Sequence, residues 1–230
     1  MLVVANIAEM PESTLVEFDP AAYGDGCAEF YDQIYPSVEL GVVDTLMELA
    51  GTRPILELGI GTGRVASALK AAGADVAGVE ASPAMIAAFR ARADNAGIRL
   101  IEGDLTSVSF AGRYGLIYSL VSTFFLLPTL ELQAAALRNI SEHLADGGFF
   151  LSEAYSDATG TAKTISNEYP VNTPSGIRSY TVTTLATPVE RLDRMAADAG
   201  LELSGRWCDW TRKPYVAASE RHISIYRKNA

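Results

Sequence analysis

The segment Glu57–Gly63 (ELGIGTG) constrains the fold of this chain more than any other feature of its sequence. It follows a short apolar run, Pro54–Leu58, that is typical of a buried strand, and it leads into Gly63–Ala72, whose apolar residues have helical spacing. Three glycines at such a junction let the backbone adopt positive φ angles and pass close to a ligand. A strand, a glycine turn and a helix in this order predict the ligand-binding edge of an open α/β sheet.

The alternation of strands and helices continues along the chain. Four further strands are predicted from short apolar runs at residues 75–79, 98–101, 114–119 and 149–154. Helices are predicted from apolar spacing at 37–50, at 83–96 after a Ser82 cap, at 130–144 after a Thr129 cap, and at 188–199. Strands that alternate with helices are joined by right-handed crossovers, so we expect a mainly parallel sheet that is covered on both faces.

Two later regions depart from this alternation. Residues 155–187 are rich in Ser, Thr, Gly and Pro, and we expect at most two short strands there, near Lys163–Glu168 and Gly176–Thr184. The final segments, Leu201–Trp210 and His222–Tyr226, are strand-like and predict an antiparallel pair added to the sheet.

The composition excludes several classes of partner and site. Lys and Arg number 18 against 28 Asp and Glu, and the resulting charge of −10 argues against binding to nucleic acid or to an anionic membrane. Two distant cysteines, Cys27 and Cys208, and two histidines cannot build a disulfide framework or a Cys- or His-rich metal site. A carboxylate site stays open on these counts, and we expect no metal. The N-terminus has no signal-peptide pattern, and no apolar run approaches the ~20 residues of a membrane span. We therefore expect a cytoplasmic protein.

The glycine spacing distinguishes between nucleotide cofactors. A dinucleotide fingerprint has the spacing G-x-G-x-x-G, whereas here the third glycine, Gly63, comes one residue early and Arg64 occupies the fingerprint position. The carboxylate of Glu57 would repel a pyrophosphate but suits an ammonium group. These features disfavour a nicotinamide-dependent oxidoreductase.

Two more acidic residues follow the next two strands. Glu80 comes 21 residues after Gly59, a distance at which a carboxylate accepts hydrogen bonds from ribose hydroxyls. Asp104, in the sequence Gly103-Asp104-Leu105 after the third strand, is placed to receive an exocyclic amino group.

Taken in order, these motifs resemble those of the class I S-adenosylmethionine-dependent methyltransferases of the small-molecule type. The resemblance covers roughly residues 25–154 and extends to the last two strands. It implies a Rossmann-like, doubly wound, mainly parallel seven-stranded sheet with an antiparallel last strand. It also implies an N-terminal helical lid at 1–50 and a cofactor-binding domain at 51–230 with a short insert at 155–187.

The resemblance assigns roles to residues of this chain. The backbone of Gly59, Gly61 and Gly63 would pass under the methionine part of the cofactor, Glu57 would lie beside its amino group, and Glu80 would hold the ribose hydroxyls. The remaining implied contacts surround the adenine and the sulfonium: Ala81, Met85, Asp104, Leu105, Ser119 and Leu120. An aromatic residue of the N-terminal helix would close over the cofactor, and the candidates are Tyr31, Tyr23 and Tyr35.

Methyl transfer from a sulfonium is an in-line displacement, in which the enzyme mainly aligns donor and acceptor. A neutral amine needs no strong base, whereas a hydroxyl often does. By location, the candidate bases are His222, Tyr155 and Glu153, with Asp157 beside them. For His222 a structural role in a strand is the favoured interpretation.

The acceptor is less clearly marked than the cofactor. The fourth strand ends in Ser119-Leu120-Val121-Ser122 rather than in the motif of adenine or glutamine N-methylation, and no Pro-Cys nucleophile is present. We expect a small-molecule acceptor, methylated on N or O in secondary metabolism, with S-adenosylhomocysteine as the second product. The alternatives are a non-methylating cyclase or isomerase on this fold and a cofactor-binding regulatory protein. The short insert predicts either a more open pocket or one completed by the second subunit of a homodimer.

Overall fold

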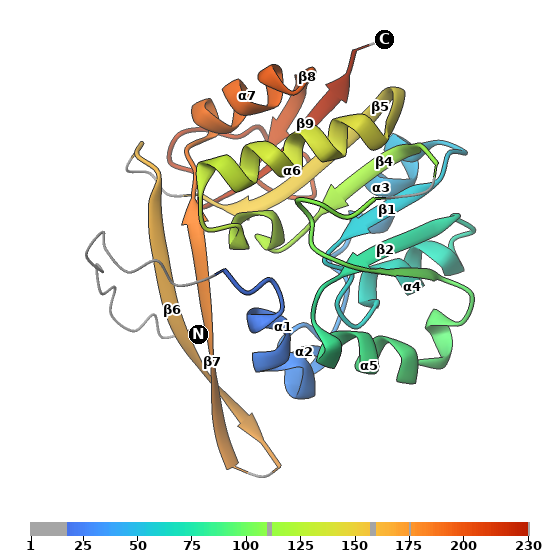
Figure 1. The fold of residues 1–230 in the computed structure, drawn as a ribbon, viewed down its shortest axis with the longest axis vertical. Coiled ribbons are helices and arrows are strands. Elements are labelled where there is room, and N and C mark those ends of the chain that lie inside the picture. The colour runs from blue at the N-terminus through green and yellow to red at the C-terminus, as the bar shows by residue number, and fades with distance from the viewer. Residues whose placement is uncertain (1–17, 110–111, 157–159, 175, 230) are drawn as a thin grey trace.

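The computed structural model describes residues 18–109, 112–156, 160–174 and 176–229, and its centre is a seven-stranded sheet. The strand order is β3-β2-β1-β4-β5-β9-β8, with β9 antiparallel to both β5 and β8 and the other neighbours parallel (Figure 1). The strands are β1 (Ile55–Leu58), β2 (Val76–Glu80), β3 (Arg99–Glu102), β4 (Tyr114–Ser119), β5 (Leu144–Tyr155), β8 (Leu201–Trp207) and β9 (Arg221–Lys228). The expected fold class is confirmed.

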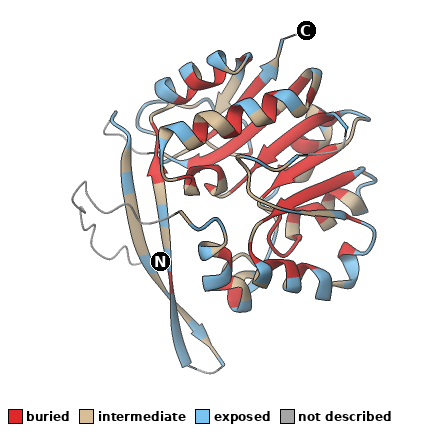
Figure 2. Ribbon diagram, viewed as in Figure 1, coloured by how far each residue is buried: buried red, intermediate tan, exposed pale blue. Residues whose placement is uncertain are grey.

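Helices cover both faces of this sheet. The α6 and α7 helices pack on one face, whereas α3, α4 and α5 contribute to the core on the other (Figure 1). Their bounds are α3 (Val42–Ala50), α4 (Arg64–Ala71), α5 (Pro83–Ala91), α6 (Leu130–His143) and α7 (Val189–Asp198). The central strands are buried on both sides (Figure 2), which explains why their sequences are continuously apolar rather than alternating.

The predicted helix caps are confirmed. The Ser82 hydroxyl accepts a hydrogen bond from Met85 N at 3.1 Å, and the Thr129 hydroxyl accepts one from Leu132 N at 3.2 Å. Each cap fixes where a helix starts, so Ser82 sets the first turn of α5 directly after the end of β2.

The region after β5 differs from the sequence prediction. Instead of two short strands, β6 (Lys163–Thr173) and β7 (Gly176–Ala186) form a long antiparallel hairpin that is a separate two-stranded sheet. The reason is that the Thr, Val and Ile residues of this segment are β-branched and favour strands, although its Ser, Thr and Gly content resembles that of a loop. The β5 strand also starts at Leu144, five residues before the strand predicted at 149–154.

The N-terminal helices α1 (Ala22–Cys27) and α2 (Tyr31–Ile34) lie between the hairpin and α5 (Figure 1). A small apolar cluster joins the three parts, with Cys27, Phe30, Met85 and Tyr180 buried at its centre. By contrast, α3 packs into the main core on the sheet. Within the described residues, no helix has the length and apolar character needed to cross a membrane.

Candidate active site

The glycine turn after β1 has a backbone that other residues adopt only with strain. Gly59, Gly61 and Gly63 have φ angles of 72°, 55° and 82°, in the left-handed region that favours glycine. A Cβ at Gly59 would also lie 2.4 Å from Cγ2 of Thr123, closer than packed atoms approach. The sequence therefore needs glycine here both for conformation and for space.

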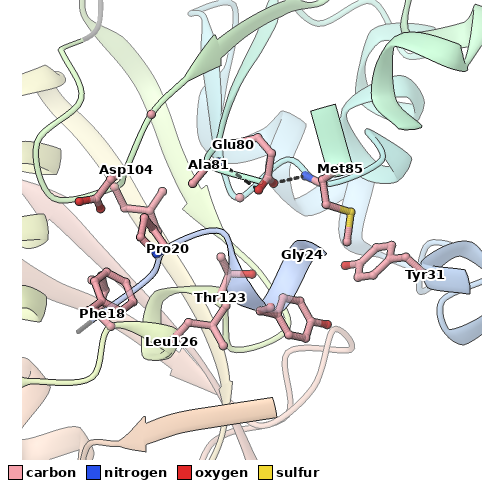
Figure 3. Close-up of a pocket in the computed structure, with 16 residues that line it drawn as sticks. Phe18, Pro20, Gly24, Tyr31, Glu80, Ala81, Met85, Asp104, Thr123 and Leu126 are labelled. Carbon is pink, nitrogen blue, oxygen red and sulfur yellow. Dashed lines mark hydrogen bonds between the residues drawn. The ribbon is translucent and has the colours of Figure 1, made fainter. Parts of the chain in front are cut away.

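A cavity of about 620 Å³ opens beside this turn, and we call it the first cavity. Eight of the residues predicted from the sequence to contact the cofactor line this cavity: Tyr31, Gly59, Gly61, Glu80, Ala81, Met85, Asp104 and Leu105. Figure 3 shows Tyr31 and Met85 on one side of the cavity and Asp104 with Phe18 on the other. The carboxyl ends of β1, β2 and β3 thus bring these separate motifs to one place.

Glu80 joins β2 to the glycine turn. Its carboxylate accepts hydrogen bonds from Gly61 N at 2.8 Å and Ala81 N at 3.0 Å (Figure 3). It also accepts one from Ser82 N at 2.9 Å. Burial raises the pKa of this carboxyl above its ordinary value, while the three N–H donors oppose that effect. A carboxylate offers about four acceptor positions, so one stays available to a ligand in the cavity.

A smaller cavity of about 320 Å³, the middle cavity, adjoins the first and shares Tyr31, Gly59 and Thr123 with it. Glu57 lies in its wall, 5% exposed, and its Oε2 has no hydrogen-bond partner among the described residues. Burial raises the pKa of this carboxyl to about 8, while the neighbouring positive charge of Arg64 opposes the rise. An unpaired buried acceptor in a cavity wall is suited to a ligand that donates hydrogen bonds.

Arg64 is a residue of this site that the sequence analysis did not assign. One of its terminal nitrogens donates to the Ser37 carbonyl at 2.7 Å, whereas its buried Nε has no partner in the described part of the chain. The sequence held a signal for it, because a cation in the first turn of a helix opposes the helix dipole. Arg64 and Glu57 thus place a basic and an acidic side chain at the middle cavity, which suits the zwitterionic end of an amino acid.

The other predicted cofactor residues have varied surroundings. Asp104 accepts hydrogen bonds from the backbone and hydroxyl of Thr106 at 2.9 and 2.7 Å. The buried Ser119 hydroxyl accepts one from Phe124 N at 3.0 Å and lines none of the three cavities described here. Leu120 lines the middle cavity.

A third cavity of about 620 Å³, the far cavity, lies beyond the middle one. The two share Arg64, Val65, Leu120 and Val121. Val121 and Ser122 follow β4 with φ angles of 51° and 63°, an uncommon conformation for a β-branched residue. Glu153 holds this turn, because its Oε2 accepts a hydrogen bond from Val121 N at 3.1 Å and its carbonyl accepts one from Ser122 N at 3.0 Å.

The three candidate bases differ in their surroundings. Glu153 is 6% exposed, and its Oε1 accepts hydrogen bonds from Trp210 at 3.1 Å and from Arg221 at 3.0 Å. His222 is buried beside Ser224, its pKa is lowered to about 4 by burial, and it lines none of the three cavities. Tyr155 lines the far cavity, although 67% of its surface is exposed, and desolvation raises the pKa of its hydroxyl. Asp157 lies outside the described residues.

The sequence of this chain matches a known protein family and a curated relative. Residues 55–148 match the family described as "Methyltransferase domain". A curated relative, the cypemycin N-terminal methyltransferase of a Streptomyces species, is 27% identical over 249 residues, which cover 91% of this chain and 99% of the relative.

Solved structures agree with this match. The CcbJ methyltransferase of Streptomyces caelestis is 29% identical, with a TM-score of 0.83, and the match covers 93% of this chain and all of that one. CalS10, an amino pentose methyltransferase of Micromonospora echinaspora solved with S-adenosylmethionine, shares the fold at 21% identity and a TM-score of 0.63, over 96% of this chain and all of that one.

The fold, the glycine turn and the cavities at the carboxyl edge of the sheet define a Rossmann-like transferase. The chain is a class I S-adenosylmethionine-dependent methyltransferase, and S-adenosylmethionine is its cofactor.

Proposed function

We propose that this enzyme methylates an amine nitrogen of a small molecule formed in secondary metabolism. The observation that carries the proposal is the environment of Glu153, the one carboxylate among the candidate bases that the structure describes. Its two oxygens accept hydrogen bonds from Val121, Trp210 and Arg221, and the positive charge of Arg221, 3.0 Å away, compensates the negative charge of the carboxylate. Such a carboxylate is poorly suited to remove a proton from a hydroxyl, whereas a neutral amine reacts through its own lone pair.

The residues around the first and middle cavities fit the cofactor. The Oε2 of Glu57 and the Nε of Arg64, neither of which has a partner among the described residues, suit the ammonium and the carboxylate of the methionine part, respectively. Glu80 would accept hydrogen bonds from the ribose hydroxyls. The adenine would lie among the residues that line the first cavity beyond Glu80, which are Ala81, Met85, Asp104 and Leu105. When bound, S-adenosylmethionine supplies a methyl group on a positively charged sulfur.

The chain's own contribution to the reaction is binding and alignment. The amine nitrogen forms the new bond to the methyl carbon as the carbon–sulfur bond breaks, and S-adenosylhomocysteine leaves as a neutral molecule. The positive charge passes to the product nitrogen, which then releases a proton to water. The α1 and α2 helices, with Tyr31 in the wall of the first cavity, would act as the lid that excludes water from the cofactor.

Further support comes from the relative and from the chain itself. The curated relative is an N-terminal methyltransferase, so its acceptor atom is an amine nitrogen. The charge of −10 favours a small acceptor over a nucleic acid. The proposal places the enzyme in the cytoplasm, in keeping with the free thiols of Cys27 and Cys208. A homodimer is part of the proposal and is tested by sedimentation at several concentrations.

The test is methyl transfer to matched acceptors. The purified enzyme is incubated with S-adenosylmethionine and with pairs of compounds that differ only in carrying an amine or a hydroxyl, including amino sugars, short peptides and arylalkylamines. Release of S-adenosylhomocysteine and the methylated product are measured by mass spectrometry. We expect turnover with amines and none with their hydroxyl partners, and transfer to hydroxyls alone would refute the proposal.

A further inference from the structure

Five tyrosines gather where α1, α2, the end of β5 and the hairpin meet. They are Tyr23, Tyr31, Tyr35, Tyr155 and Tyr180, and we call them the tyrosine cluster. The rings of Tyr31 and Tyr35 are 5.0 Å apart and those of Tyr23 and Tyr180 are 6.4 Å apart. The Phe30 ring lies 5.8 Å from that of Tyr180, and Tyr35 and Tyr155 line the same cavity.

The tyrosine cluster stands between the cofactor cavities and the far cavity. Tyr23 and Tyr31 line the first cavity, and Tyr31 also lines the middle one. Tyr35 and Tyr155 line the far cavity. A molecule in the far cavity would therefore lie against the rings and hydroxyls of Tyr35 and Tyr155 and near the wall, at Leu120 and Val121, that this cavity shares with the middle one.

These hydroxyls stay protonated near neutral pH. Burial raises the pKa of Tyr31, Tyr35 and Tyr180 well above the ordinary value, and the neighbouring tyrosines add to the effect at Tyr35 and Tyr180. The cluster therefore presents neutral hydroxyls and ring faces rather than phenolates.

The carboxylates of the far cavity are already paired. Arg221 donates to Glu39 at 2.8 and 3.0 Å and to Glu153 at 3.0 Å. The fourth charged residue of this wall, Arg64, lies over the Tyr35 ring with its guanidinium carbon 5.7 Å from the centroid. Two positive and two negative groups balance, so the wall offers a ligand aromatic surface rather than a free anion.

We propose that the far cavity is the acceptor site and that its tyrosines recognise an alkylamine through ring faces and neutral hydroxyls, without a salt bridge. This inference rests on the proposed function. A free carboxylate would hold the amine as an ammonium, whose lone pair carries a proton and cannot attack carbon. Aromatic rings bind a cation more weakly, yet they stabilise the positive charge as it passes from sulfur to nitrogen.

The first experiment measures recognition of a positive charge apart from turnover. The enzyme saturated with S-adenosylhomocysteine is titrated with choline and with 3,3-dimethylbutan-1-ol, its uncharged analogue of the same shape, and binding is followed by ligand-observed NMR. We expect choline to bind roughly three- to tenfold more tightly than the alcohol. Equal binding of the two probes to the wild-type enzyme would overturn the inference.

Variants then assign this preference to the cluster. Tyr35→Leu and Tyr155→Leu should each reduce the preference for choline at least twofold to threefold, whereas Tyr155→Phe, which keeps the ring, should largely retain it. Tyr215→Leu is the matched control, because Tyr215 lines none of the three cavities. Unchanged affinity for S-adenosylhomocysteine shows that each variant is folded, since Tyr35 and Tyr155 line only the far cavity. A preference that survives both leucine variants would also overturn the inference.

Failure of the proposed N-methylation can be distinguished from failure of the acceptor-site assignment. If the wild-type enzyme methylates only hydroxyls, the proposed N-methylation is wrong. If it methylates amines, but KM for the amine is the same in Tyr35→Leu, Tyr155→Leu and the wild type, only the assignment of the acceptor site is wrong.

Discussion

Replacing Glu57 with glutamine should stabilise the cofactor-free protein against unfolding and weaken its binding of the cofactor. In the unfolded chain this carboxyl has the ordinary pKa of 4.5, whereas burial raises its pKa in the folded protein to about 8. Below pH 4.5 both states carry the proton, and no stability is lost. Between pH 4.5 and 8 the unfolded state is favoured by ~1.4 kcal/mol for each pH unit, and above pH 8 the loss is constant.

The size of the effect follows from this pKa difference. At pH 7 the loss amounts to about 3 kcal/mol, because pH 7 lies about 2.5 units above the unfolded pKa and still below the folded one. Glu57→Gln removes the ionisation and with it this loss. For a chain of this length, 1 kcal/mol changes the melting temperature by roughly 2–4 °C, so the variant should melt roughly 6–12 °C higher.

The same substitution should cost affinity. We assign the Oε2 of Glu57, which has no hydrogen-bond partner in the described part of the chain, to the cofactor ammonium. A hydrogen bond to a charged group contributes about 1.5–3 kcal/mol, so binding of S-adenosylmethionine should weaken roughly ten- to hundredfold.

Calorimetry tests both effects. Scanning calorimetry of the protein without cofactor at pH 5 and 7.5 should show a large gain for Glu57→Gln at pH 7.5 and a small one at pH 5, and titration calorimetry should show weaker binding of S-adenosylmethionine. Glu102→Gln is the control, because Glu102 is a surface acid whose side chain is 58% exposed and pairs with Arg90. A variant that melts at or below the wild-type temperature at pH 7.5, or that binds the cofactor as tightly, would refute the reasoning.

Three further substitutions test the rest of the site. Glu80→Ala should weaken binding of S-adenosylmethionine at least tenfold and lower the melting temperature, because three backbone N–H groups lose their acceptor; titration and melting measure both. Arg64→Met should weaken cofactor binding about tenfold in the same titration, because the methionine carboxylate loses its cation. Glu153→Gln should lower the melting temperature, because Arg221 and the Val121 turn lose a charged partner. It should leave the shape of the pH–rate profile for amine methylation unchanged between pH 6 and 9.

For each of these substitutions, one outcome would contradict the role that we assign to the residue. If Glu80→Ala binds S-adenosylmethionine as tightly as the wild type, the assignment of Glu80 to the ribose hydroxyls is wrong. Unchanged binding in Arg64→Met, beside an Arg191→Met control on the exposed side of α7, would remove the carboxylate assignment. Loss of the acidic limb of the profile, the fall in rate toward low pH, in Glu153→Gln would make Glu153 a general base and contradict the proposed acceptor class.

Sequence reasoning was most successful where one contiguous segment carries the information. The strands at the centre of the sheet and the caps at Ser82 and Thr129 were predicted within a few residues, because apolar runs and capping hydroxyls act locally. It was least successful in the insert, where Thr-rich strands resemble a loop in composition. No local signal marked the strained turn at Val121 and Ser122, which Glu153 holds from the neighbouring strand.

The sequence by itself determined the class of fold and the cofactor motifs. A glycine turn of this spacing, with Glu57 before it and Glu80 at the end of the next strand, restricts both the backbone and the ligand through residues that lie close together in the chain. Only the tertiary structure decided what surrounds the acceptor, because the far cavity joins Tyr35, Glu153 and Arg221 from segments more than sixty residues apart. It also decided the protonation of Glu57, because a pKa depends on burial and on neighbouring charges that exist only once the sheet and its helices have packed.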